Sequence, residues 1–385
     1  MLLLHTSDWH LGHVLYNFDR SDEQQAMMAY VLSLVEQRQP DLFLLAGDVF
    51  HTSTPSNAVQ QHFAETVMRL RMAAPNMTIV VIAGNHDSGT KHEIFRTPWA
   101  ALNVHMIGTL DRDHLDNHII ELPGKGYVVA VPYVHERNRP DDLFDQLMQR
   151  VADRNEQSLP VVLAAHLTVA HADFTGHDHA SENTVGGIDS VDLATMGQGY
   201  DYLALGHIHK PQFVHGGEGR VRYSGTPLPV SFDECYEHSI SLVDIAAHGQ
   251  PPAVEKVAVP CPWPLVSLPA DHFGSWDEAR DLLQRFPDDQ QAYIRLNVEL
   301  HDPLPAGSRD EALRLAASKQ CRFCLINARY AEREQGPARR LTIAEFRNEE
   351  PVDIVRRYAE DKHKPFDEEM ERLFQETLRS IEQGA

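Results

Sequence analysis

Residues 79–87 read Ile-Val-Val-Ile-Ala-Gly-Asn-His-Asp, an apolar run that ends abruptly in side chains able to bind a metal ion. The same change from apolar to polar occurs five times in the first 210 residues. The other four apolar runs are Leu2–Leu4, Leu42–Ala46, Val161–Ala165 and Tyr202–Leu205, and they lead into Asp8-Trp9-His10, Gly47-Asp48, His166 and Gly206-His207-Ile208-His209. Uninterrupted apolar runs of this length are typical of strands that are buried on both faces of a sheet.

Two segments between these runs, 22–37 and 57–70, have the apolar spacing of amphipathic helices. Alternating strand and helix signals predict a layered α/β fold, in which ligands bind at the carboxyl ends of the strands. Taken singly, each polar group is more often a turn or a structural histidine than a functional site. Five such groups in the same structural position are hard to explain as turns, so we expect one shared site.

The residue types at these positions favour a site for metal ions. Imidazole together with carboxylate and amide oxygen suits manganese, iron or zinc better than calcium. No cysteine is placed to join them, which argues against a structural zinc site. Hydrolysis of a phosphodiester needs a nucleophile at neutral pH and a positive charge on the phosphate, and two ions about 3.5–4 Å apart supply both.

The order Asp-x-His, Gly-Asp, Gly-Asn-His-Asp, His, Gly-His-x-His resembles the calcineurin-like metallophosphoesterases. The resemblance implies a layered β-sandwich core flanked by helices, with two metal ions bound beside it. One ion would be held by Asp8, His10, Asp48 and His209, and the other by Asp48, Asn85, His166 and His207, with Asp48 bridging the two.

The same resemblance implies three catalytic residues beside the metal ligands. His86 would stabilise the transition state or protonate the leaving oxygen, and Asp87 would orient its ring. His51 would contact the phosphate; bacterial relatives often carry Asp at this position, so a plain loop histidine is the alternative.

The residues around the motifs are similar to those of the SbcD family, nuclease subunits that act on DNA double-strand breaks. The stretches that carry this similarity are 5–12, 46–50, 84–88, 206–212 and 223–234, and Thr226 stands where Ser is common. The resemblance implies a manganese-dependent DNA nuclease with 3′-to-5′ double-strand exonuclease and single-strand or hairpin endonuclease activity. It also implies a homodimer that works with an SbcC-like coiled-coil ATPase in DNA repair and recombination.

The charge of the chain argues against a protein that holds nucleic acid by bulk electrostatics. It carries 34 Lys and Arg against 56 Asp and Glu, a net charge of −22, whereas domains that bind DNA in this way are usually basic. The alternative is therefore a metallophosphatase or a cyclic-nucleotide phosphodiesterase of the same superfamily. A scaffold with a vestigial metal site is a further alternative. The presence of all seven candidate ligands argues against it.

After the nuclease domain, expected over residues 1–258, four prolines between 260 and 269 predict a linker without regular structure. Helices at 276–285 and 309–318 and strands at 292–298 and 321–326 then predict a small α+β unit, and residues 270–345 match the capping domain of the SbcD family in position. Two amphipathic segments in residues 350–385, one of which runs from Phe366 to Ile381, predict terminal helices that pack on this chain or dock the ATPase.

Four cysteines are too few for a secreted disulfide scaffold and favour a reducing cytoplasm. Cys321 and Cys324 form a C-x-x-C, but no second pair accompanies it and the surrounding residues favour a strand. The run Met1–Leu4 is too short for a signal peptide or a membrane span. The loop from His171 to His179 is expected to be an exposed loop or lid and not a third metal site.

Overall fold

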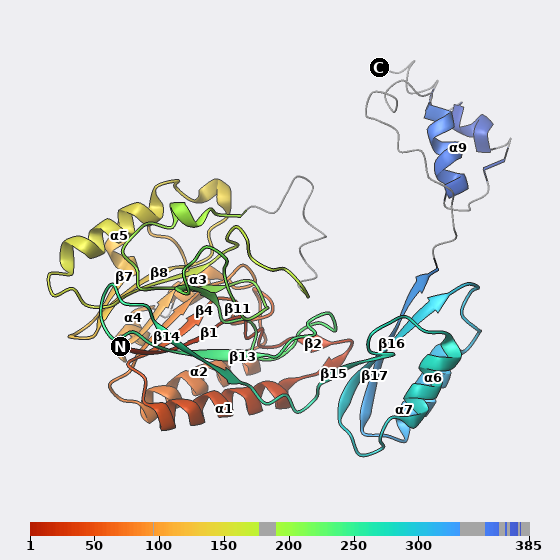
Figure 1. Ribbon diagram of the computed structural model, residues 1–385, viewed down its shortest axis with the longest axis horizontal. Coiled ribbons are helices and arrows are strands. Elements are labelled where there is room, and N and C mark those ends of the chain that lie inside the picture. Colours follow the sequence, from red (N-terminus) through yellow and green to blue (C-terminus); the bar gives the residue numbers. More distant parts are fainter. Residues whose placement is uncertain are drawn as a thin grey trace. The chain divides into compact units, whose positions relative to one another are not determined.

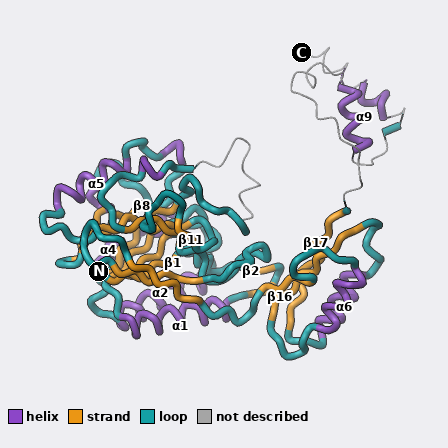
Figure 2. Tube along the Cα trace, viewed as in Figure 1, coloured by secondary structure: helices purple, strands orange, loops and turns teal. Residues whose placement is uncertain are grey.

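The computed structural model describes residues 1–94, 96–176, 190–331, 351–361, 366–367, 370–375 and 378. The chain forms two compact units, Met1–Tyr330 and Ala331–Ala385. Figures 1 and 2 show the first unit as stacked sheets covered by helices, with a smaller sheet that carries its own helices. Each unit is described by itself below.

The first sheet has six strands in the order β14-β13-β1-β4-β5-β6. Their bounds are β14 (Ala253–Ala258), β13 (Ser239–Asp244), β1 (Leu2–Thr6), β4 (Leu42–Ala46), β5 (Thr78–Ile82) and β6 (Val104–Ile107). Strands β1, β4, β5 and β6 run parallel to one another. At the other edge, β13 is antiparallel to β1, and β14 is antiparallel to β13. The carboxyl ends of β1, β4 and β5 therefore lie along one edge of the sheet.

The second sheet also has six strands, in the order β11-β12-β10-β9-β8-β7. Their bounds are β11 (Gln212–Phe213), β12 (Val221–Tyr223), β10 (Tyr202–Gly206), β9 (Val161–His166), β8 (Gly126–Val131) and β7 (Ile119–Leu122). The inner four strands are parallel, and the edge strands β11 and β7 are antiparallel to their neighbours. All residues of β8, β9 and β10 are buried, as expected for strands covered on both faces.

Three apolar layers hold the two sheets and their helices together. Side chains such as Leu44 and Ala164 fill the space between the sheets. Helices α1 (Ser21–Arg38) and α2 (Asn57–Ala73) pack on the outer face of the first sheet, and α5 (Leu143–Arg154) packs on the outer face of the second (Figure 1). This order of helix, sheet, sheet and helix confirms the predicted α/β layered fold, and the predicted strand and helix positions agree to within a few residues.

Short elements complete the core. Helices α3 (Gly89–Ile94) and α4 (Arg96–Ala100) follow β5, and short 3-10 helices lie at Leu115–His118, Glu136–Asn138 and Leu193–Thr195. The hairpin of β2 (Val14–Leu15) and β3 (Phe18–Asp19) turns at Tyr16 and Asn17, both of which have positive φ. This hairpin projects from the segment that follows β1, next to the residues expected to bind metal.

A three-stranded parallel sheet follows, in the order β15-β16-β17. It consists of β15 (Leu265–Leu268), β16 (Ala292–Leu300) and β17 (Cys321–Tyr330), with α6 (Trp276–Arg285) and α7 (Ser308–Ala317) packed on one face. The helices and strands predicted here are confirmed, but the prediction of a linker without regular structure is wrong for residues 265–268. Pro264 and Pro269 flank β15 without interrupting it, so its backbone remains able to pair with β16.

The other face of the three-stranded sheet packs against the β2–β3 hairpin and the segment around Phe232. Tyr293 and Cys324 of the sheet share an apolar cluster with Leu15 and Phe232. The guanidinium of Arg322 lies 3.9 Å from the ring centroid of Trp263, inside the same contact region. The sheet thereby touches two segments that lead directly to the candidate site.

The second unit contains α9 (Pro351–Asp361) and a short helical stretch at 370–375, joined by an ion pair of 2.7 Å between Arg356 and Glu371. These positions carry part of the two predicted amphipathic segments, whereas Ile381 lies outside the described residues. Residues 332–350, which include the end of the predicted capping domain, and His177 and His179 also lie outside them. Among the described residues, no helix is long and apolar enough to cross a membrane.

Candidate metal centre

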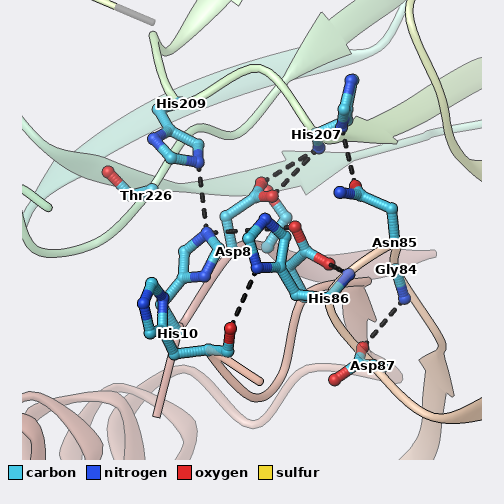
Figure 3. Close-up of polar contacts among 12 residues, drawn as sticks. Asp8, His10, Gly84, Asn85, His86, Asp87, His207, His209 and Thr226 are labelled. Carbon is cyan, nitrogen blue, oxygen red and sulfur yellow. Dashed lines mark hydrogen bonds and ion pairs between the residues drawn. The ribbon is translucent and has the colours of Figure 1, made fainter. Parts of the chain in front are cut away.

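The predicted ligands all follow strands whose carboxyl ends meet at one edge of the two stacked sheets. Asp8, Asp48 and Asn85 come after β1, β4 and β5 of the first sheet, whereas His166 ends β9 and His207 follows β10 of the second. Figure 3 shows the side chains that the two sheets bring together here. The structure thus collects residues that are up to about 200 positions apart in the sequence into one cluster.

The loops after β1 and β4 run side by side and hold each other in place. The backbone N–H of Asp8 donates to the carbonyl of Gly47 at 2.9 Å, and that of His10 donates to the carbonyl of Asp48 at 3.0 Å. An isolated parallel bridge between Leu11 and Phe50 continues this contact. The two carboxylates are therefore fixed relative to each other by backbone hydrogen bonds.

Four of the expected ligands have an unusual backbone conformation. Asp8, His10, Asp48 and His207 have φ values of 53°, 44°, 48° and 96°. A residue with a side chain in such a region costs on the order of 1–3 kcal/mol, and such residues concentrate at functional sites. The surrounding hydrogen bonds therefore hold these four residues in a backbone conformation that is intrinsically unfavourable for residues other than glycine.

Two glycines of the motifs are required by close approach. A Cβ atom at Gly47 would lie 2.1 Å from Nδ1 of His166, and one at Gly84 would lie 2.1 Å from Oδ1 of Asp48. Both distances are far shorter than a van der Waals contact. The Gly-Asp and Gly-Asn-His-Asp motifs thus carry glycine because the ligand side chains pack directly on the backbone.

The first group of side chains consists of Asp8, His10 and His209, which are all buried. Nε2 of His10 lies 3.1 Å from Nε2 of His209 (Figure 3), and 3.9 Å from Oδ2 of Asp48. The Asp8 carboxylate accepts from the backbone N–H of His207 at 3.1 and 3.2 Å. The possible ligand atoms of Asp8, His10 and His209 lie within 4.8 Å of one another.

The second group lies on the open side of the cluster. Oδ1 of Asn85 lies 3.0 Å from Nε2 of His166 and 2.9 Å from Nδ1 of His207. Nε2 of His166 is 3.5 Å from Oδ2 of Asp48. Asn85 is exposed and His207 is half-buried, whereas His166 is buried. The second group is therefore the more exposed of the two.

Burial and charge act against each other on the ionisable groups of the cluster. Burial alone would lower the pKa of His166, but the Asp48 carboxylate beside it raises that pKa to about 9. Burial likewise opposes ionisation of Asp48, yet His166 keeps the pKa of this carboxyl well below its usual range. Burial raises the pKa of Asp8. Without metal, these shifts favour an imidazolium at His166 beside a carboxylate at Asp48.

The cluster fits two divalent ions. It gathers four imidazoles, two carboxylates and one amide oxygen, a donor set suited to transition metals. Asp48 has a carboxylate oxygen near ring nitrogens of both groups, which is the placement that a bridging ligand needs. Nε2 of His10 and Nε2 of His209 face each other. A cation bound by the two rings and the carboxylates would take the place of this close contact between two possible metal-ligand atoms.

The expected catalytic residues lie beside the cluster, but one contact differs from the expectation. Nδ1 of His86 lies 2.9 Å from the backbone carbonyl of His51, and the two rings are stacked. The carboxylate of Asp87, expected to orient His86, accepts instead from the backbone N–H groups of Val49, Phe50 and Gly84. Asp87 therefore holds the loop after β4, because its side chain points to the backbone that carries Asp48.

Two residues near the cluster, His13 and Glu234, were not among the predicted site residues. His13 lies against His51 with ring centroids 4.7 Å apart, and burial lowers the pKa of His13 to about 3. Glu234 accepts a hydrogen bond of 2.8 Å from Nδ1 of His209. His13 lies three residues after His10, so its position next to the Asp-x-His motif could have indicated it. Glu234 lies 25 residues from His209, and no local pattern connects the two.

A cavity of ≈ 290 Å³ opens onto the cluster. It is lined by His10, His51, His86 and His209, and by Tyr16 of the β2–β3 hairpin. The imidazoles and an exposed aromatic ring thus share one opening. A larger cavity of ≈ 690 Å³ is apolar and lies between α2 and the α3–α4 segment, so it is not the place where the polar groups converge.

The fold and the converging side chains define a two-metal phosphoesterase, and the model of the calcineurin-like phosphoesterase family matches residues 1–211. The SbcD chain of the SbcCD nuclease from Rhodobacter capsulatus is 32% identical, covering 70% of this chain and 72% of the relative. Its counterpart from Escherichia coli K12 is 30% identical, covering 78% and 80%. The one from Bacillus subtilis is 29% identical, covering 100% and 99%.

The chain therefore belongs to the calcineurin-like phosphoesterases and, among them, to the SbcD family. It is a hydrolase of phosphodiester bonds, and its centre is built for two divalent metal ions.

Proposed function

We propose that this chain is a DNA nuclease with 3′-to-5′ exonuclease activity on duplex ends and endonuclease activity on single strands and hairpins. It works with an SbcC-like coiled-coil ATPase in DNA end processing, repair and recombination. The curated relatives that match along most of this chain are named as nuclease subunits. A DNA substrate goes with a cytoplasmic location, which the cysteine content also favours.

The observation that carries the hydrolytic part of the proposal is the position of Asp48 near both groups of ligands, whereas the DNA substrate rests on the match to nuclease subunits along most of the chain. One ion would be held by Asp8, His10, Asp48 and His209, and the other by Asp48, Asn85, His166 and His207. When bound, two such ions supply an acidified water and positive charge on the phosphate oxygens. Manganese is the metal we propose. The mixed imidazole and oxygen donors suit manganese, iron or zinc, and the resemblance to the SbcD family favours manganese among these.

The protein's own groups would orient the substrate and move a proton. Since Nδ1 of His86 faces the carbonyl of His51, the proton at Nδ1 is retained and Nε2 is the atom that exchanges a proton with the leaving oxygen. His51 lines the same cavity and would contact the phosphate. Asp87 would act through the backbone that it holds and not through the ring of His86.

The exposed ring of Tyr16 offers a surface for a nucleobase beside the cluster. Stacking of a base on an aromatic side chain contributes about 1–3 kcal/mol and does not depend on the sequence of the strand. An acidic chain needs such contacts more than a basic one does, because bulk electrostatics repel its substrate.

The net charge of −22 favours a second candidate, a metallophosphatase or cyclic-nucleotide phosphodiesterase with the same centre. One experiment separates the two. Purified protein with manganese is given linear duplex DNA, single-stranded DNA, bis(p-nitrophenyl) phosphate and a cyclic nucleotide. Release of nucleotides from DNA supports the nuclease, whereas turnover of the small esters alone would contradict it.

The remaining parts of the chain have proposed roles in assembly. Residues 1–258 would form the nuclease domain, residues 270–345 a capping domain and residues 350–385 helices that bind the ATPase. The three-stranded sheet supports the second assignment, because it contacts the hairpin beside the metal cluster. The ATPase is tested by co-purification of the two chains from one host.

We also propose a homodimer within a larger complex with the ATPase. Met72, Ile94 and Leu102 are exposed, and Ile94 and Leu102 line the apolar cavity between α2 and α3–α4. Exposed apolar surface of this kind is typical of protein interfaces. Light scattering of the purified chain should give the mass of a dimer, and Ile94→Glu should shift it toward a monomer.

A further inference from the structure

His209, one of the expected metal ligands, is held from behind by a carboxylate. Its Nδ1 atom lies 2.8 Å from Oε1 of Glu234, and both side chains are buried. This contact fixes the ring so that Nε2 faces His10 and the rest of the first group. A carboxylate on the far nitrogen of a ligating histidine sets both the tautomer and the orientation of the ring.

Glu234 is itself fixed by the segment that carries it. Its Oε2 atom lies 3.3 Å from the Thr226 hydroxyl and 3.3 Å from the backbone nitrogen of Val230, both of which can donate to it. Nε2 of His238 is 3.7 Å from the same oxygen. The carboxylate therefore has one well-defined position, provided that the segment from 226 to 238 keeps its shape.

The three-stranded sheet grips this segment directly before Glu234. The guanidinium of Arg295, on β16, pairs with Asp233 at 2.6 Å and donates to the carbonyl of Phe232 at 3.3 Å. It also lies over the ring of Phe232, 5.2 Å from the centroid. Arg295 in turn donates to the hydroxyl of Ser267 on the neighbouring strand β15 at 3.0 Å. A line of contacts thus joins the sheet to His209.

We propose that Glu234 is the positioning residue for His209, and that Arg295 of the three-stranded sheet keeps Glu234 in place. The position of this sheet then sets how tightly the ion bound by His209 is held. The inference rests on the two-metal centre of the proposed function and not on its substrate. Removing a group that orients a metal ligand typically costs 10–100-fold in metal affinity.

The first experiment measures binding of Mn²⁺ to the metal-free protein by calorimetry and electron paramagnetic resonance. Wild type should bind two ions, and Glu234→Ala should bind one of them about 10–100-fold more weakly with the other unchanged. Glu234→Gln keeps an oxygen that can accept from Nδ1 of His209, so it should restore most of the affinity. Binding of both ions by Glu234→Ala as in wild type would overturn the proposal, as would equal weakening by Ala and Gln.

The second experiment tests the link to the sheet with a matched pair of variants. Arg329, on β17, also pairs with an acid, Glu299, at 3.1 Å and lies over an aromatic ring, Phe273. Arg295→Ala should weaken the same single ion as Glu234→Ala does, whereas Arg329→Ala should bind both ions as wild type does. If the two arginine variants bind alike, the sheet does not act on His209.

These readouts separate this inference from the proposed nuclease activity. A wild type that binds two ions but leaves DNA intact would contradict the nuclease and leave the role of Glu234 standing. Thermal melting of each metal-free variant checks that the fold is retained, and the comparison of Arg295→Ala with Arg329→Ala covers the case in which Glu234→Ala does not fold.

Discussion

Oδ1 of Asp48 accepts a hydrogen bond of 2.8 Å from the backbone N–H of His86. The expected bridging ligand thereby positions the backbone of the expected proton-transferring residue, while its other oxygen faces His166. This hydrogen bond involves the backbone of His86 and not its ring. The position of His86 therefore depends on Asp48, but Asp48 does not depend on the His86 ring. Changes at Asp48 should disturb both functions, whereas changes of the His86 ring should leave the metal ligands in place.

Asp48→Ala should abolish metal binding and hydrolysis together. The substitution removes a carboxylate that lies near ring nitrogens of both groups of ligands, and with it the acceptor for the His86 N–H. Elemental analysis of the purified variant tests this, and two ions retained per chain would contradict it. Asp201→Asn is the control, since Asp201 is equally buried but accepts from the backbone of Val161 and Gly249.

His86→Ala and His86→Asn should keep both ions and the fold and lose turnover. A general acid or a stabiliser of charge in the transition state typically contributes ~10²–10⁴ in rate. Single-turnover hydrolysis of a nuclease substrate, measured with metal content on the same sample, checks the expectation. Loss of metal along with activity would make His86 a ligand.

Gly84→Ala should damage the centre although it adds only a methyl group. The new Cβ would meet Oδ1 of Asp48 at 2.1 Å and the backbone nitrogen of Asp48 at 2.3 Å. Both are part of a closely packed loop, so Asp48 must move, and we expect metal affinity to fall by tenfold or more. Gly124→Ala is the control, since a Cβ there meets open space and its only cost is the positive φ of 69° at that position, away from Asp48. Equal metal affinity in the two variants would show that the loop after β4 can move to accommodate the added methyl group without loss of the metal site.

Protons should compete with metal ions at His166. The pKa of His166 in the metal-free protein is raised to about 9 by Asp48. The ion pair therefore stabilises the metal-free fold fully below the ordinary pKa of 6.5, and this contribution is lost as pH rises through 9. Metal binding has the opposite dependence, because the ligand must be neutral.

Affinity for Mn²⁺ should accordingly increase between about pH 6.5 and 8, with proton release on binding. Calorimetry in two buffers of different ionisation enthalpy measures the released protons. A binding enthalpy that does not depend on the buffer would show that His166 is already neutral.

Deletion of residues from Glu350 onward should leave a folded protein that retains its metal ions. We expect the truncated chain to cleave single-stranded DNA with manganese, but to lose the coiled-coil ATPase and ATP-dependent processing of duplex ends. The reason is that terminal amphipathic helices after a separate domain are suited to docking. Capture of the ATPase by the truncated chain would contradict this, and a lower melting temperature would show that the helices pack on their own chain.

Much of the centre can be predicted from sequence because its parts are local. Each ligand group directly follows a buried strand, so the apolar run and the polar residues after it are visible together, as at Ile79 to Asp87. Parallel strands then bring these ends to one edge by their geometry alone. The strand Leu265–Leu268 shows the limit of this approach, since prolines on both sides hide a segment whose pairing with β16 decides its structure.

The amino-acid sequence by itself determined the buried strands, the polar residues at their ends and the small α+β unit, because periodicity and motif spacing act over short distances. The resemblance of these motifs to a known family added the assignment of the seven candidate ligands. Only the tertiary structure decided which groups hold the functional side chains. His86 faces the carbonyl of His51 and not Asp87, His209 is held by Glu234, and Arg295 reaches across 62 residues to Asp233. Such contacts form between segments that are distant in the chain, so no local pattern records them, and packing of the sheets alone brings them together.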